Sequence, residues 1–141
     1  MRIFFTFLAF VAIFFMALFL GRPGAERSAI RFGKSVHSVI SDKEITDWAE
    51  SFQHSFPAPN GESIDIPRSK WPIPLQNLLK SNDYAKALIS FDGSQKVNGV
   101  IVLNTINGIV VPLNESLPDL SYFSIHMIAD SCPYFAISIY K

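Results

Sequence analysis

The chain has 141 residues, 49% of them hydrophobic, and its twelve basic and twelve acidic residues cancel at neutral pH. Neither sign of charge forms a long run, which argues against a nucleic-acid partner because such binding needs a clustered basic surface. The only cysteine, Cys132, excludes an internal disulfide and a cysteine-rich metal cage.

The first predicted element is an apolar segment, Ile3 to Leu20. Its eighteen residues carry no charge, and thirteen of them are Leu, Ile, Val or Phe. Because a helix rises about 1.5 Å per residue, the segment would span roughly 27 Å, close to the hydrocarbon thickness of a bilayer. We therefore expect residues 1–21 to form a single-pass transmembrane anchor that contacts the lipid bilayer.

The main alternative to an anchor is a removable signal peptide. Signal peptides have an apolar run of about 7–15 residues followed by a small-residue cleavage site. Here the run is longer, and Gly21 to Ala25 offers no clean pair of small residues for cleavage. The basic residues after the segment favour a cytoplasmic C-terminal domain, whereas the short basic start is typical of export. The side therefore stays open, with a slight lean towards the extracytoplasmic side.

The residues after the apolar segment are expected to form a linker. Gly21 to Gly24 contains two glycines and a proline, which predict the end of the membrane helix. Residues 22–40 are expected to form a partly helical juxtamembrane stalk, and residues 41–141 the globular domain.

Two amphipathic helices are predicted at the start of this domain. Ser41-Asp42-Lys43-Glu44 has the form of a capping box, and apolar residues then follow at helical spacing up to Pro57, so we expect a helix at about 42–55. That apolar stripe consists of Ile45, Trp48, Ala49, Phe52 and Phe56. Residues 62–66 are expected to be extended. Pro72 and Pro74 suit the first turn of a second helix at about 72–80, with Trp71 packed inward.

From Ala85 the apolar pattern changes to alternation, which is typical of strands. Two turn signals, Asp92-Gly93 and Asn107-Gly108, separate the first three of them. Five strands are expected, over residues 85–91, 97–104, 109–113, 122–129 and 134–140. Because short links cannot join parallel strands, we expect an antiparallel meander with both helices on one face, which is an α+β fold.

Cys132 is the residue most able to act as a nucleophile. It lies between the last two predicted strands, and His126 lies six residues earlier, so a histidine base and a thiol could meet around the turn. A half-buried cysteine before Pro133 explains the same pattern without any chemistry. The catalytic pair Cys132 and His126 is therefore kept as an alternative to no catalytic residues.

Metal and cofactor signatures are not found in the sequence. His37, His54 and His126 have no His, Cys or carboxylate partner at helical ligand spacing, so solvated histidines are expected. Asp42, Glu44, Asp47 and Glu50 lie on or near one helix, where acidic residues near the N-terminus suit the helix dipole. No cofactor and no small-molecule ligand are inferred.

Three hypotheses about function follow. The first is a membrane-anchored, non-enzymatic domain that binds a protein partner, as an accessory part of a cell-envelope complex. The second is a small envelope hydrolase or thiol enzyme that uses Cys132 and His126. The third is a pilin-like subunit, because an apolar helix before an antiparallel sheet is the plan of that family, although a glutamate inside the apolar helix is missing.

Overall fold

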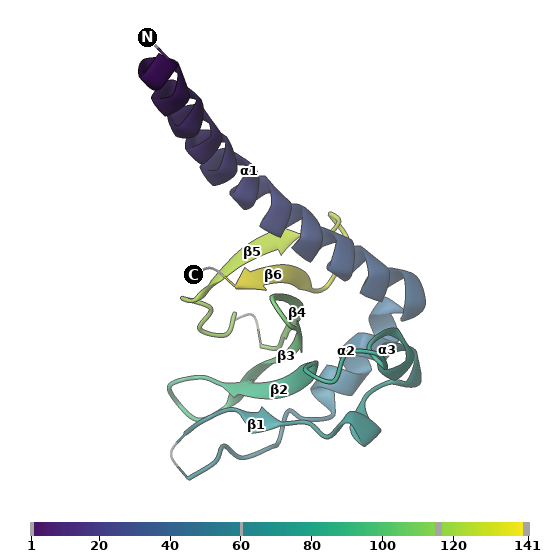
Figure 1. The fold of residues 1–141 in the computed structure, drawn as a ribbon. Helices are drawn as coiled ribbons and strands as arrows, with labels where there is room; N and C mark the ends of the chain where they lie inside the picture. The colour runs from purple at the N-terminus through teal and green to yellow at the C-terminus, as the bar shows by residue number, and fades with distance from the viewer. Residues whose placement is uncertain (1, 60, 115–116, 140–141) are drawn as a thin grey trace.

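The computed structural model describes residues 2–59, 61–114 and 117–139, and for residues 2–8, 10, 14–23 and 139 it describes the backbone alone. Its longest element is α1 (Arg2–Val39), which projects away from the sheet at its N-terminal end (Figure 1). The predicted break at Gly21 to Gly24 is wrong, because α1 continues through both glycines and Pro23. A proline removes one backbone hydrogen bond, and the long helix continues on both sides of it.

Most side chains of the predicted membrane anchor, Ile3 to Leu20, lie outside the described part of the chain. Across the side chains that are described, no helix combines the length and the apolar character needed to cross a bilayer. The anchor therefore stays a prediction.

The C-terminal half of α1 packs on the sheet. Ala29, Phe32 and Val36 are buried there, at the spacing of one helix face. Gly33 lets the helix come close, because a Cβ at this position would lie 2.5 Å from Ile128 Cδ1 and 3.3 Å from the Ala136 Cβ. Part of the predicted stalk, residues 22–40, thus contributes to the core through Ala29, Phe32, Val36 and Ile40.

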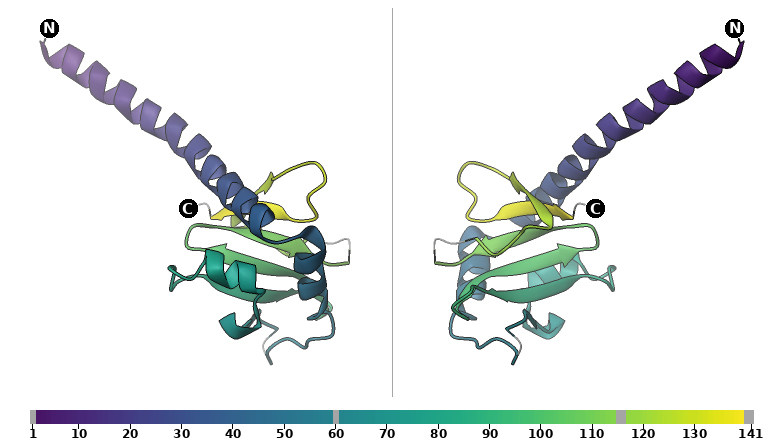
Figure 2. Two further views of the ribbon diagram at one scale, coloured as in Figure 1. Left: turned by 90° about the vertical axis from the view of Figure 1, so that its right-hand side faces the viewer. Right: turned by 90° about the vertical axis from the view of Figure 1, so that its left-hand side faces the viewer.

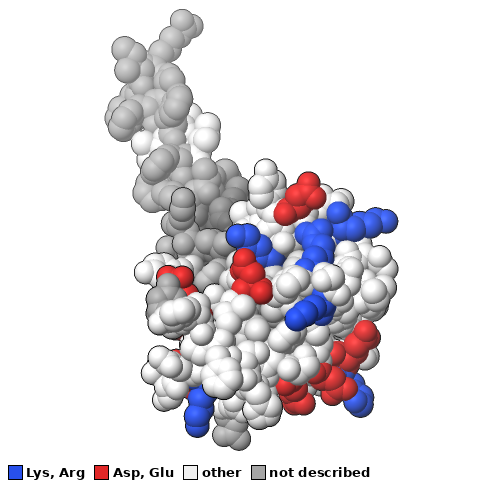
Figure 3. All heavy atoms as spheres, turned by 90° about the horizontal axis from the view of Figure 1, so that it is seen from below, with Lys and Arg blue, Asp and Glu red and all other residues white. Residues whose placement is uncertain are grey.

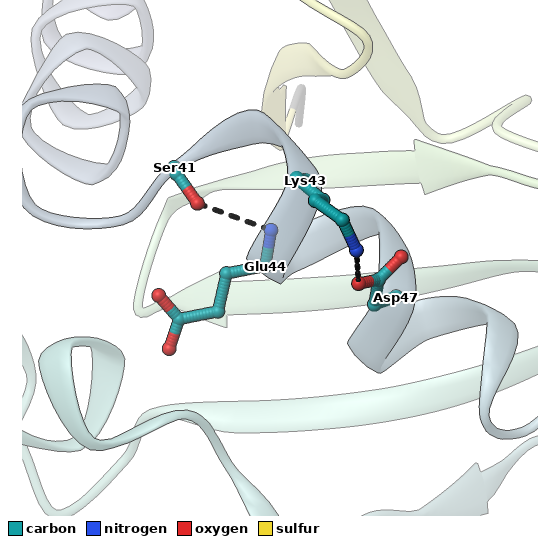
Figure 4. A network of polar contacts seen from close by, with 4 residues as sticks. All are labelled: Ser41, Lys43, Glu44 and Asp47. Carbon is teal, nitrogen blue, oxygen red and sulfur yellow. Dashed lines mark hydrogen bonds and ion pairs between the residues drawn. The ribbon is translucent and has the colours of Figure 1, made fainter.

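The second helix, α2 (Asp42–Glu50), begins where the capping pattern predicts. The Ser41 hydroxyl accepts a hydrogen bond from the Glu44 backbone N–H at 3.2 Å, and Lys43 pairs with Asp47 on the exposed side (Figure 4). The helix ends five residues earlier than predicted. Beyond it, the Ser51 hydroxyl donates to the Trp48 carbonyl at 2.6 Å, a local bond that competes with continuation of the helix. Phe56, expected in the apolar stripe, is exposed.

The helix after Trp71, predicted at about 72–80, is also shorter than expected. The 3-10 helix η1 (Arg68–Lys70) leads into α3 (Ile73–Leu78). Trp71 is buried, as expected, and its ring N–H donates to the Ile66 carbonyl at 2.9 Å. Leu75, also fully buried, adds about 1.5–3 kcal/mol of hydrophobic stabilisation.

The sheet has six antiparallel strands in the order β1-β2-β3-β4-β6-β5 (Figure 1). Their bounds are β1 (Ile64–Asp65), β2 (Lys86–Phe91), β3 (Val97–Asn104), β4 (Asn107–Pro112), β5 (Phe123–Met127) and β6 (Phe135–Ile139). The α+β class and the antiparallel sheet are confirmed. The five-stranded meander is wrong in two respects, because residues 64–65 add a strand and β6 rather than β5 pairs with β4. The burial of Ala136, Ile137 and Ser138 suits an interior strand, which explains why β6 lies between β4 and β5.

The turn between β3 and β4 lies two residues before the predicted one. Thr105 and Ile106 form it, with Thr105 at a φ of 59°, and Asn104 pairs with Asn107 across the hairpin. Gly108 instead lies inside β4, where a Cβ would come within 2.2 Å of the Val102 carbonyl oxygen. The close approach of the β3 and β4 backbones, and not a turn, thus explains why position 108 is a glycine.

The helices cover one face of the sheet. In Figure 2, α2 and α3 lie against the same side, and the main core forms between these helices, α1 and the strands. A smaller apolar cluster on the other face contains Ile101, Val110, Leu120 and Ile137. On the surface seen in Figure 3, positive and negative side chains are interspersed among uncharged ones.

Candidate functional site

Three side chains with metal-binding or nucleophilic atoms meet where α1, α2 and the turn before β6 come together. His37 lies in the last turn of α1, Asp42 is the first residue of α2, and Cys132 precedes β6. Only Ile40 and Ser41 separate the two helices, so the chain turns back and places Asp42 beside His37. The His37 Nε2 and Asp42 Oδ1 atoms are 3.1 Å apart.

The cluster is compact and accessible from one side. One ligand atom of each of His37, Asp42 and Cys132 lies within 4.8 Å of the others. The side chains of His37 and Asp42 are 41% and 44% exposed, whereas Cys132 is half-buried. Tyr134 lies on the core side of the cluster, where it is buried, with its ring centroid 6.2 Å from that of His37.

The electrostatics of the cluster favour a neutral thiol. Burial raises the pKa of the Cys132 thiol and the negative charge of Asp42 adds to this, while hydrogen bonds with the backbone and with the side chain of Tyr134 oppose it. Burial likewise raises the pKa of Tyr134 far above its usual range. The charged forms of both groups are therefore disfavoured, whereas an activated cysteine nucleophile has a lowered pKa.

His126 lies elsewhere, on β5 beneath α1. Its Nε2 atom is 3.0 Å from the Ser138 hydroxyl oxygen on β6, and its Nδ1 atom is 3.9 Å from Glu26 Oε1 on α1. The order serine, histidine, carboxylate matches that of a hydrolase triad. Ser138 is only 2% exposed, however, and the 3.9 Å between His126 Nδ1 and Glu26 Oε1 is too long for a hydrogen bond. We interpret these contacts as structural.

A second polar contact supports this interpretation. The Asn107 side-chain amide on β4 donates to the Ser28 hydroxyl on α1 at 2.9 Å. Asn107 and Ser138 are neighbours across β4 and β6, so the two contacts lie side by side under the helix. Together they fix the position of α1 on the sheet.

The sequence-predicted pairing of Cys132 with His126 is not among the contacts of the described residues. Cys132 interacts with Asp42 and Tyr134, and His126 with Ser138 and Glu26. The structure therefore brings Cys132 to a different histidine, His37. Helical ligand spacing could not reveal this group, because His37 and Asp42 lie on two helices and Cys132 is distant in sequence.

The remaining predicted polar residues lie on the surface. His54 is exposed and lines a shallow hollow between the loop after α2 and the turn after β2, together with Asp92, Lys96 and Asn114. Glu44, Asp47 and Glu50 are exposed on α2. Neither set combines a nucleophile with a base, so the hollow has no evident chemistry of its own.

The edge strand β5 forms an exposed apolar surface. Ile125 and Met127 are 42% and 62% exposed, and nearby Tyr122 is 79% exposed. Ile125 and Met127 lie on the face away from the helices, next to Phe123 and Phe135. We call these five residues the β5 surface.

Comparison with family models, curated proteins and solved structures found no match to this chain. Any functional proposal therefore depends on the residues of this chain alone.

Proposed function

We propose that this protein is a membrane-anchored, non-enzymatic accessory domain that binds a partner protein through the β5 surface. The membrane part of the proposal is supported by the uncharged segment Ile3 to Leu20. It is also supported by α1, whose backbone continues from that segment onto the sheet without a linker. Arg27 is exposed on α1 seven residues beyond the segment, where a cation favours contact with lipid headgroups.

The observation that carries the partner-binding part is the unprotected edge of β5. Natural sheets protect their edges with very short strands, prolines, bulges or charged side chains. The opposite edge, β1, has only two residues. By contrast, β5 has five residues, Phe-Ser-Ile-His-Met, with no proline, lysine or carboxylate. Within the described residues β5 is an edge strand, and with Ile125 and Met127 exposed it suits the addition of an extended, apolar segment of another protein.

The membrane part is tested by fractionation of cells that express the full chain. The protein should stay in the membrane pellet after a high-salt and alkaline wash, and detergent should release it. Recovery of full-length protein in the soluble fraction without detergent would contradict the anchor. Protease access in intact and opened cells then assigns the side of the membrane that carries the sheet.

The partner is tested by photocrosslinking in those membranes. A photoreactive residue at Ile125 should give a discrete protein adduct, whereas the same residue at Tyr84, which is 80% exposed and lies outside the β5 surface, should not. Crosslinking of position 125 to lipid alone, or equal adducts at both positions, would overturn the assignment of β5 as a protein-binding edge.

A further inference from the structure

We propose that His37, Asp42 and Cys132 form a binding site for a divalent transition metal ion of the zinc class. Imidazole nitrogen, carboxylate oxygen and thiolate sulfur are all common zinc ligands. Within the described residues, these three side chains place their ligand atoms within 4.8 Å of one another. This inference is independent of the partner-binding function proposed above.

The distances are close to those of a tetrahedral site. With metal–ligand bonds of about 2.0–2.3 Å, two ligand atoms of a tetrahedron lie roughly 3.3–3.8 Å apart. His37 Nε2 and Asp42 Oδ1 are already 3.1 Å apart, and the third atom lies within 4.8 Å. The spacing of the three atoms is thus within about 1 Å of that of a tetrahedral site.

One carboxylate oxygen of the cluster is placed to accept a cation. Asp42 Oδ1 is shielded from solvent and accepts no hydrogen bond from any described group, although His37 Nε2 lies close to it. When the histidine carries its proton on Nδ1, two lone pairs face each other, and a cation between them removes that repulsion. Buried polar atoms without partners are rare in folded proteins.

The ligand set selects the class of metal. Mg²⁺ and Ca²⁺ prefer oxygen ligands only, whereas a sulfur and an imidazole favour Zn²⁺, Co²⁺ and similar ions. Binding replaces the thiol proton by the metal, so each ion bound releases one proton from Cys132. The thiolate and the Asp42 carboxylate then neutralise the two positive charges. Three protein ligands leave a fourth position for water or for a ligand from another molecule.

The test uses the full-length chain in detergent, without a polyhistidine tag, titrated with Co²⁺ and then Zn²⁺. We expect one Co²⁺ per chain, with a thiolate-to-cobalt charge-transfer band and the visible bands of tetrahedral cobalt, all abolished by one equivalent of Zn²⁺. The Cys132→Ser variant should lose the charge-transfer band. His37→Ala and Asp42→Asn should weaken Zn²⁺ binding at least about tenfold, because even loss of an outer-shell partner costs about 10–100-fold.

Two variants serve as matched controls. His54→Ala removes an exposed histidine outside the cluster, and Asp47→Asn removes a carboxylate one turn further along α2, so both should bind Co²⁺ as the unmodified chain does. Circular dichroism of each variant verifies that it is folded. Absence of a thiolate band, or stoichiometric binding that survives both Cys132→Ser and His37→Ala, would overturn the site.

Discussion

Cys132 shows how its surroundings decide what a side chain can do. The residue is half-buried and still accessible to a reagent, but burial and the Asp42 charge raise the pKa of its thiol. Because only the thiolate attacks electrophiles, a raised pKa lowers the reactive fraction at neutral pH. Proximity to a histidine is therefore not sufficient for a cysteine nucleophile.

This leads to a prediction for the metal-free protein. In the presence of a chelator, alkylation of Cys132 should be slow at pH 7 and should accelerate as the pH rises, with a midpoint above that of an ordinary thiol, about 8.5. Asp42→Asn should move the midpoint to lower pH, because it removes a charge that disfavours the thiolate. Mass spectrometry of the alkylated chain at several pH values measures both midpoints.

The same experiment decides the alternative of a thiol enzyme. His126→Ala should leave the alkylation profile unchanged, because His126 contacts Ser138 and Glu26. Fast labelling at neutral pH that is lost in His126→Ala would instead support a catalytic pair of Cys132 and His126.

Gly108 is a second residue whose environment, and not its local sequence, explains its identity. We predict that Gly108→Ala destabilises the protein by about 1–3 kcal/mol, the usual cost of overpacking, because the new methyl group collides with the backbone of β3. Gly93→Ala is the matched control, since a Cβ there meets nothing within 4 Å. Thermal unfolding in detergent compares the two, and equal midpoints would contradict the close approach.

At the scale of the element, the start of α2 depends on one hydroxyl. Ser41→Ala should destabilise the fold by about 0.5–2 kcal/mol, because it leaves the Glu44 N–H without its acceptor. Ser51→Ala removes the same atom at the other end of α2, where the hydroxyl only donates to a carbonyl, and should change stability less. Chemical denaturation measures the difference, which should vanish if the cap contributes nothing.

The elements also show how far sequence patterns reach. The capping pattern predicted the start of α2, and the apolar segment after the Asp92-Gly93 turn predicted β3, because both signals are local. The Asn107-Gly108 signal failed because tertiary contacts determine both residues: Asn107 bonds to Ser28 on α1, and Gly108 approaches Val102. Non-local pairing of β4 with β6 and the grouping of His37 with Cys132 leave no periodic trace in the sequence.

At the scale of the whole molecule, α1 is one continuous helix that joins the projecting N-terminal segment to the sheet. Its C-terminal half is held by Gly33 close to the sheet and by the Asn107–Ser28 bond. Because no linker interrupts α1, any orientation of its N-terminal half in a membrane is passed on to the sheet. Under the proposed function, the helix therefore sets the direction in which the β5 surface faces.

Insertions of alanine after Gly24 test this coupling. The site is exposed and a Cβ at Gly24 meets nothing within 4 Å, so extra helical residues fit there. Each inserted residue turns the sheet by about 100° and moves it by about 1.5 Å. Two alanines thus give about 200° and 3 Å, whereas four give about 40° net and 6 Å.

If orientation controls partner binding, two alanines should reduce the protein adduct at position 125 far more than four alanines do. If only distance mattered, the order would be reversed, and a helix acting as a loose tether would give equal adducts in both. Unchanged thermal unfolding of the two variants shows that the sheet itself is intact. Equal adducts would therefore refute a rigid connection between the N-terminal half of α1 and the β5 surface.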